Sequence, residues 1–204
     1  PISEVSPVIN TMVNSNPTDD LYDLQFSFPV GVGGGEAGIE TDGNYIYTTK
    51  WNGGSVFYQY QLDGTYVGEI TCGAATAIRD LAFDGTYFYG GAATTTVYEM
   101  DFTNQTVIST ITAPTACRAI AYDPDNDGFW ANNWSTDITL FDRNGNTINS
   151  FVVGAMGSFY GLAWENVLPG GPFLWGASQD GNGNDLVKMD IAAGGTQVET
   201  YDIA

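Results

Sequence analysis

The sequence has no histidine and few basic residues, and these shortages argue against several classes of protein. Its 204 residues include 5 Lys and Arg against 24 Asp and Glu, which gives a formal net charge of −19. Without histidine there is no Ser-His or Cys-His nucleophile pair and no zinc site of the HExxH type. The negative charge argues against nucleic acid or an anionic membrane as a partner, because phosphate recognition needs clustered Lys and Arg.

Long hydrophobic runs are also missing. No stretch approaches the roughly 18 apolar residues of a membrane-spanning helix, so we expect no membrane insertion. No signal peptide is visible and the chain starts at Pro1, so we expect a processed or excised product. The hydrophobic fraction of 43% is high enough to fill a core, which argues against a disordered acidic tail. A surface that is poor in lysine favours a secreted or cell-surface protein.

What the sequence does contain is an internal repeat. Four five-residue segments share one pattern, a hydrophobic strand that ends on an acid, and they recur about every 40 residues: 38–42, 80–84, 119–123 and 161–165. Each is followed by an aromatic strand, by a third strand that ends on aspartate, and by a fourth strand. Asp-Gly and Asn-Gly pairs mark the hairpin turns, and the strands show alternating hydrophobic patterning.

A four-stranded antiparallel unit that repeats about every 40–45 residues is typical of a β-propeller blade. The sequence therefore predicts an all-β protein with blades at about 37–71, 78–112, 118–153 and 159–204. Residues 21–30 match the fourth strand of a blade and add one outer strand, so the propeller domain covers 21–204, after a linker at 1–20. Four blades plus one strand indicate part of a larger propeller, closed by the rest of a longer chain or by a second chain.

On this blade pattern and composition, residues 21–204 resemble the secreted bacterial β-propeller repeat proteins of the NHL, YncE-like and PQQ-like group, which often belong to surface proteins. The resemblance implies the fold and an extracellular location. It implies no catalytic residue, because the His and Trp-Asp signature of WD repeats and the Asp box of sialidases are both absent.

Two of the five cations occupy one repeated position. Arg79 and Arg118 each stand two residues before the first large hydrophobic residue of an inner strand, and the fourth blade has Tyr160 there. This position lies beside the central channel, so the two guanidiniums are a candidate site for a carboxylate or sulfate ligand. The favoured alternative is that they neutralise the neighbouring Asp80 or Glu36.

Two tryptophans also fall at related positions, after the second strand of a blade. Trp51 is followed by Asn-Gly-Gly, and Trp134 is preceded by two asparagines. Exposed indole rings with nearby amides would suit the stacking and hydrogen bonding of a sugar. The favoured alternative is that both rings pack between blades.

A metal site is suggested by the run D-P-D-N-D-G at 123–128, which begins like a calcium loop. In such a loop Asp123, Asp125 and Asp127 would converge on one hard cation. The glutamate that closes the loop is missing, because the twelfth position is Trp134. The favoured alternative is a hairpin turn, so we expect no cofactor, with calcium as the one ion to test.

The two cysteines lie in equivalent connections of neighbouring blades. Cys72 and Cys117 both stand between a fourth strand and the next inner strand. We expect a disulfide that closes a loop of about 45 residues and stabilises the fold by about 3–4 kcal/mol. The alternative is a pair of free thiols, because the two positions are offset within the repeat.

These features predict a non-enzymatic binding or scaffold module that recognises a protein or a carbohydrate at the channel face. The alternative is a carboxylate-dependent glycoside hydrolase or lyase, which needs two acids with separated pKa values. Its candidates are the acids that end the inner strands: Asp42, Asp84, Asp123 and Glu165. These acids recur at the same position of every blade instead of being unique to one blade, so no catalytic residue is assigned.

Overall fold

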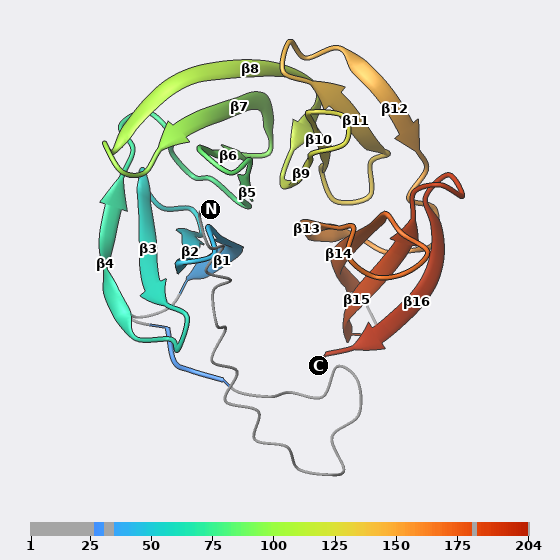
Figure 1. The fold of residues 1–204 in the computed structure, drawn as a ribbon, viewed down its shortest axis with the longest axis horizontal. Coiled ribbons are helices and arrows are strands. Elements are labelled where there is room, and N and C mark those ends of the chain that lie inside the picture. Colours follow the sequence, from blue (N-terminus) through green and yellow to red (C-terminus); the bar gives the residue numbers. More distant parts are fainter. Residues whose placement is uncertain (1–26, 31–34, 181–182, 204) are drawn as a thin grey trace, which may run out of the picture.

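Four antiparallel sheets make up the protein, and each is a meander of four consecutive strands. The computed structural model describes residues 27–30, 35–180 and 183–203, and these ranges contain no helix. In particular, no helix in them is long and apolar enough to cross a membrane. The sheets stand in chain order around a common centre as a four-bladed β-propeller (Figure 1). The predicted fold class is therefore confirmed.

The strands follow the repeat unit of the sequence. Blade 1 contains β1 (Glu36–Thr41), β2 (Tyr45–Lys50), β3 (Val56–Gln61) and β4 (Tyr66–Thr71). Blade 2 contains β5 (Ala82–Phe83), β6 (Phe88–Gly91), β7 (Thr94–Asp101) and β8 (Thr106–Cys117). Blade 3 contains β9 (Ala119–Asp123), β10 (Gly128–Asn132), β11 (Ile138–Asp142) and β12 (Thr147–Phe151). Blade 4 contains β13 (Phe159–Glu165), β14 (Phe173–Asp180), β15 (Gly183–Asp190) and β16 (Thr196–Asp202). The first strand of each blade lies innermost and the fourth lies at the rim (Figure 1).

The acids that end the inner strands hold the first turn of each blade. Asp84 accepts hydrogen bonds from the backbone N–H groups of Thr86 and Tyr87, both at 2.8 Å, and from the Tyr89 hydroxyl at 3.0 Å. The corresponding acids in the other blades accept backbone N–H groups in the same way: Asp42, Asp123 and Glu165. A carboxylate that satisfies turn amides is a structural feature, which explains why it recurs in every blade.

The acids that end the third strands play the same part in the second repeated turn. Asp63 accepts the N–H of Thr65 at 2.9 Å, and Asp101 accepts the N–H of Asn104 at 2.9 Å. These bonds lower the pKa of both carboxyls, since they favour the charged form. The remaining members of the series bond in the same way: Asp142 and Asp190. These hydrogen bonds explain why an aspartate recurs at this position in every blade.

Three hydrophobic cores join consecutive blades. Successive side chains of a strand point to opposite faces of its sheet. One face of a blade therefore packs on the preceding blade, and the other face packs on the next. Their central residues are Tyr47, Phe57, Phe88 and Phe102 between blades 1 and 2, Tyr89, Phe129 and Phe141 between blades 2 and 3, and Trp130, Leu174 and Met189 between blades 3 and 4.

Blades 1 and 4 meet in a different way. β1 and β13 approach each other near the centre, but no hydrophobic core among the described residues joins the two blades. A pocket of about 340 Å³ lies between them instead. We call it the seam pocket, lined by Gly38, Ile39 and Trp51 of blade 1 and by Tyr160, Gly161 and Ser178 of blade 4.

Two strand boundaries differ from the sequence prediction. Residues 27–30 end the predicted outer strand 21–30 but are not in a strand, and the rest of that segment, with the linker 1–20, lies outside the described residues. β8 runs on to Cys117, where it pairs with Thr94 of β7. Pro114 is tolerated in this extension because β8 is the edge of its sheet.

The predicted disulfide is wrong, because Cys72 and Cys117 are both free, buried thiols. Cys72 belongs to the core between blades 1 and 2, whereas Cys117 belongs to the core between blades 2 and 3. Blade 2 therefore separates the two sulfurs. Burial raises the pKa of Cys72 to about 11 and that of Cys117 to about 12, so both stay protonated and pack as small hydrophobic side chains.

Candidate functional site

Arg79 and Arg118 hold equivalent places in neighbouring blades, as the repeat predicts. The backbone N–H of Arg79 donates to the carbonyl of Gly91 at the end of β6, at 3.0 Å. The N–H of Arg118 donates to the carbonyl of Asn132 at the end of β10, at 2.8 Å. Each arginine therefore leads into an inner strand beside the end of the second strand of its own blade.

The five predicted ligand-binding residues come together in one group, which we call the arginine–aromatic cluster: Trp51, Arg79, Arg118, Trp134 and Tyr160. The Arg79 guanidinium carbon lies 3.9 Å from the centre of the Trp51 ring. The Arg118 guanidinium carbon lies 4.6 Å from the Trp134 ring centre, 5.4 Å from that of Trp51 and 5.7 Å from that of Tyr160. All four blades contribute to this cluster.

Neither arginine of the cluster has an ion pair among the described residues. The salt bridges there join Arg143 to two aspartates and Lys188 to Glu199. The Arg79 Nη2 instead donates to the Asn52 side chain at 2.6 Å, and the Arg118 Nε donates to the Asn133 side chain at 3.2 Å. The expected neutralisation by Asp80 or Glu36 is therefore wrong.

The two acids of that alternative are bonded elsewhere. Glu36 accepts hydrogen bonds from the hydroxyls of Tyr60, at 2.6 Å, and Thr48. Asp80 accepts backbone N–H groups of two other blades. Their oxygens are thus satisfied without the guanidiniums, which leaves the cations of the cluster without a carboxylate partner.

Several donors of the cluster have no partner at all. The Arg79 Nε and Nη1 and the Arg118 Nη1 are buried without a hydrogen bond. Arg118 as a residue is only 8% exposed. Burial and the adjacent charge of Arg79 both lower the pKa of Arg118. Two like charges at close range with unsatisfied donors favour an anion between or beside them.

The tryptophans of the cluster stay accessible to solvent. Trp51 is 37% exposed and Trp134 is 44% exposed. Asn52 and Trp134 also adopt left-handed backbone angles, with φ of 52° and 61°. Such angles cost on the order of 1–3 kcal/mol outside glycine and cluster at functional sites. The predicted packing between blades explains the contact of Trp51 with Arg79 of blade 2 and that of Trp134 with Tyr160 of blade 4, but it does not use the exposed part of either side chain.

Asp80 is the central residue that the sequence analysis missed. Its Oδ2 accepts the N–H of Ile120 at 2.9 Å and the N–H of Leu162 at 3.0 Å, so it ties blade 2 to blades 3 and 4. The residue is 2% exposed, and burial raises its pKa well above the usual range. The repeat held a signal for it, since the matching positions of the other blades have only small residues: Gly38, Ala119 and Gly161.

Glu40 is a second acid that only one blade has. It lies on β1 where the other inner strands have alanine, and the backbone N–H of Thr41 donates to it at 2.8 Å. Burial is the main cause that raises the pKa of Glu40 to about 7, against hydrogen bonds from the backbone of Thr41 and Phe83. The inner strands of blades 1 and 2 therefore hold two carboxyls that ionise less readily than usual.

The candidate calcium ligands hold a hairpin turn. Asp123 accepts the N–H of Asp125 and the indole N–H of Trp130, both at 3.0 Å. Asp127 pairs with Arg143 at 2.7 Å. In the part of the chain that the structure describes, no group of three His, Cys, Asp or Glu side chains is placed to hold a metal ion. The contacts favour the turn, and calcium stays a prediction.

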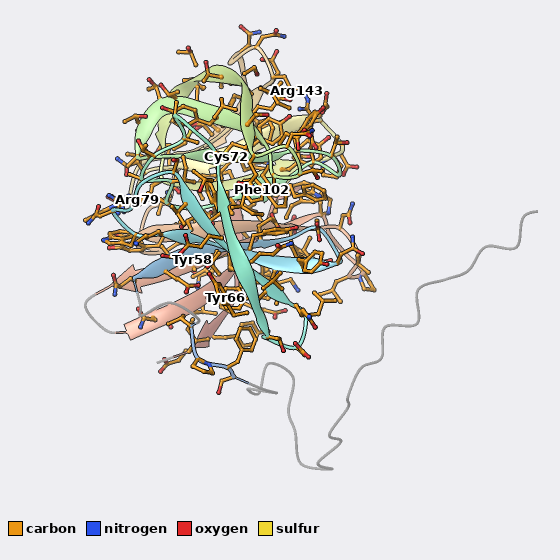
Figure 2. The ribbon with its side chains drawn as sticks, turned by 90° about the vertical axis from the view of Figure 1, so that its left-hand side faces the viewer. Tyr58, Tyr66, Cys72, Arg79, Phe102 and Arg143 are labelled. Carbon is orange, nitrogen blue, oxygen red and sulfur yellow. The ribbon has the colours of Figure 1, made fainter. Side chains whose placement is uncertain are left out.

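Arg143 serves a different purpose from the arginines of the cluster. It lies between β11 and β12 and contacts Asp84 at 3.0 Å and the Tyr89 hydroxyl at 2.6 Å, both in blade 2. Figure 2 shows Arg143 and Arg79 at opposite faces of the disc. One face therefore has an arginine that is fully paired and joins blades 2 and 3, while the other has unpaired arginines.

Solved structures share this architecture at low sequence identity. The chain is similar to a structure of Kuenenia stuttgartiensis hydrazine synthase, with 17% identity, a TM-score of 0.56, and coverage of 89% of this chain and 53% of the other. It is also similar to a chain of "Structure of U3-55K", with 11% identity, a TM-score of 0.54, and coverage of 82% and 52%. A chain of "Crystal Structure of Mitotic Checkpoint Complex" is 14% identical, with a TM-score of 0.53 and coverage of 82% of this chain and 51% of the other.

What these likenesses show is the fold. The chain is a β-propeller. It spans about half the length of the structures that it matches. No protein-family model matches the sequence, and no curated protein matches it either.

Proposed function

We propose that this β-propeller is a non-enzymatic binding module that recognises an anionic group through the arginine–aromatic cluster. The observation that supports it most is the isolation of Arg79 and Arg118. In a chain of net charge −19 these two cations have no ion pair among the described residues, although acids outnumber bases 24 to 5. A carboxylate or sulfate ligand would supply the missing partner.

The aromatic members of the cluster extend the proposal to the body of the ligand. Trp51 and Trp134 each leave more than a third of their surface exposed next to the guanidiniums. Sugar rings present an apolar face that packs on such surfaces, and carboxylated or sulfated glycans also carry the anion. An acidic glycan therefore fits both halves of the cluster, and an acidic protein segment is the competing ligand. A secreted or cell-surface location belongs to the same proposal, supported by the lysine-poor composition.

The second candidate function is that of a carboxylate-dependent glycoside hydrolase or lyase. The four acids first considered hold turns, but Asp80 and Glu40 are each unique to one blade and have raised pKa values. Separated or raised pKa values are what acid–base catalysis by carboxyls requires. Turnover of a polysaccharide panel by the wild type, abolished in Asp80→Asn or Glu40→Gln, would establish it in place of the binding module.

The proposal is tested by binding to an array that contains carboxylated glycans, sulfated glycans, neutral glycans and acidic peptides. We expect retention on the acidic glycans, and its loss in the double variant Arg79→Gln with Arg118→Gln. Lys50→Gln is the matched control, because it removes one exposed cation that has no contact with the rings of the cluster. Retention on peptides alone would replace the glycan by a protein partner, and equal binding by wild type and double variant would overturn the site.

A further inference from the structure

The seam pocket has the size and the lining of a site for a small molecule. Its volume of about 340 Å³ is at the lower end of the range of roughly 300–1,000 Å³ found for small-molecule sites. It opens beside the arginine–aromatic cluster, since Trp51, Arg79 and Tyr160 line both. A pocket of this size holds one compact group, such as a single sugar residue.

The two consecutive residues of blade 2 give the pocket its polarity. Arg79 turns toward Trp51 and keeps unpartnered N–H donors, while Asp80 turns toward the axis and bonds Ile120 and Leu162. A side chain at Gly38 would collide with Asp80, so glycine is needed where the two inner strands pass. The pocket thus combines a cationic donor, an aromatic ring and a carboxyl group.

We propose that the seam pocket binds one sugar acid, with its carboxylate at Arg79, its ring on Trp51 and a hydroxyl at Asp80. The inference rests on the proposed function, because it names the group that the module recognises. The occupant is either a free sugar acid or the terminal residue of an acidic glycan, since the pocket has room for a single residue. The rest of a longer chain would run out over Arg118 and Trp134.

Calorimetric titration with three sugar acids tests the pocket directly: galacturonate, glucuronate and N-acetylneuraminate. We expect at least one to bind and glucose not to bind. Gly161→Val should abolish this binding by filling the pocket. Gly161→Ala is the matched control, because the nearest atoms to a Cβ at that position are the Asp80 carboxyl atoms at 3.6–3.8 Å, which is ordinary contact. Circular dichroism checks that both variants fold.

Polygalacturonate separates this inference from the proposed function. If the polymer binds through Arg79 and Arg118 but no sugar acid binds and Gly161→Val has no effect, the pocket proposal fails while the binding module stands. If neither polymer nor sugar acid binds, both fail. Affinity that scales with chain ends indicates a terminal residue, and binding of the monomer alone indicates the free acid.

Discussion

At the scale of single residues, Asp80 shows how one side chain can organise a repeat protein. Three of the four blades have Gly or Ala at its position, so its carboxyl has room at the centre. There it accepts one backbone N–H from blade 3 and one from blade 4. The seam between blades 1 and 4 lacks a hydrophobic core, which makes this polar tie more important for holding the inner strands together.

Asp80→Ala should destabilise the protein by about 2–4 kcal/mol, because it leaves two buried N–H groups unsatisfied. Asp80→Asn should cost less, since its amide oxygen still accepts. Urea denaturation measures both, with the exposed Asp137→Ala as control. Wild-type stability in Asp80→Ala would show that the tie contributes nothing.

Glu40 predicts a dependence of stability on pH. Its pKa is raised from 4.5 to about 7 in the folded protein. The protonated carboxyl therefore stabilises the fold fully below about pH 4.5, and this contribution is lost as the pH rises through 7. Glu40→Gln stays neutral, so its melting temperature should exceed that of the wild type at about pH 8 and approach it at about pH 4. At 1.36 kcal/mol for each of about 2.5 pKa units, the difference is at most about 3.4 kcal/mol.

The exposed Glu69→Gln on β4 is the matched control, since it removes the same charge from the rim. A difference between Glu40→Gln and the wild type that is the same at every pH would contradict the assignment.

At the scale of elements, the repeat makes the strands and turns predictable. Each hairpin depends on local signals, such as the acid that ends the inner strand and the glycine that follows it. Gly43 and Gly85, for example, have φ of 84° and 97° in two equivalent turns. Contacts between blades were predictable only in part. Arg79 and Arg118 were found by their phase, but the pairing of Asp80 with Ile120 and Leu162 joins residues 40 and 82 positions away.

The cysteines show the same limit. Equivalent connections place Cys72 and Cys117 in neighbouring blades, but the offset within the repeat puts their side chains in different cores. The position of a residue within the repeat predicts the element on which it lies. It does not predict which neighbouring blade the side chain faces when the residue is offset from its counterpart in another repeat.

For the turn at 123–128 we predict that calcium does not change the stability of the protein. Its carboxylates already bond the backbone, Trp130 and Arg143, so adding calcium should leave the melting temperature equal to that in EDTA. Differential scanning calorimetry measures this. A rise with calcium that Asp125→Asn removes would instead establish the metal site, because a ligand that binds only the folded state raises its stability.

At the scale of the whole molecule, the charge distribution gives the two faces different characters. On one face Arg143 is fully paired, and on the other Arg79 and Arg118 stack on aromatic rings without a carboxylate (Figure 2). Acids outnumber bases 24 to 5 in the chain, so the net charge repels an anionic ligand and the unpaired guanidiniums attract it. The cluster is therefore the place where we expect an acidic ligand to bind.

Tryptophan fluorescence during titration with polygalacturonate tests this claim most directly, because Trp51 and Trp134 belong to the cluster. We predict a saturable change in emission that weakens with added salt, is absent with neutral dextran, and is lost in the Arg79→Gln, Arg118→Gln double variant. A response that the double variant retains in full, or no response in the wild type, would contradict the account.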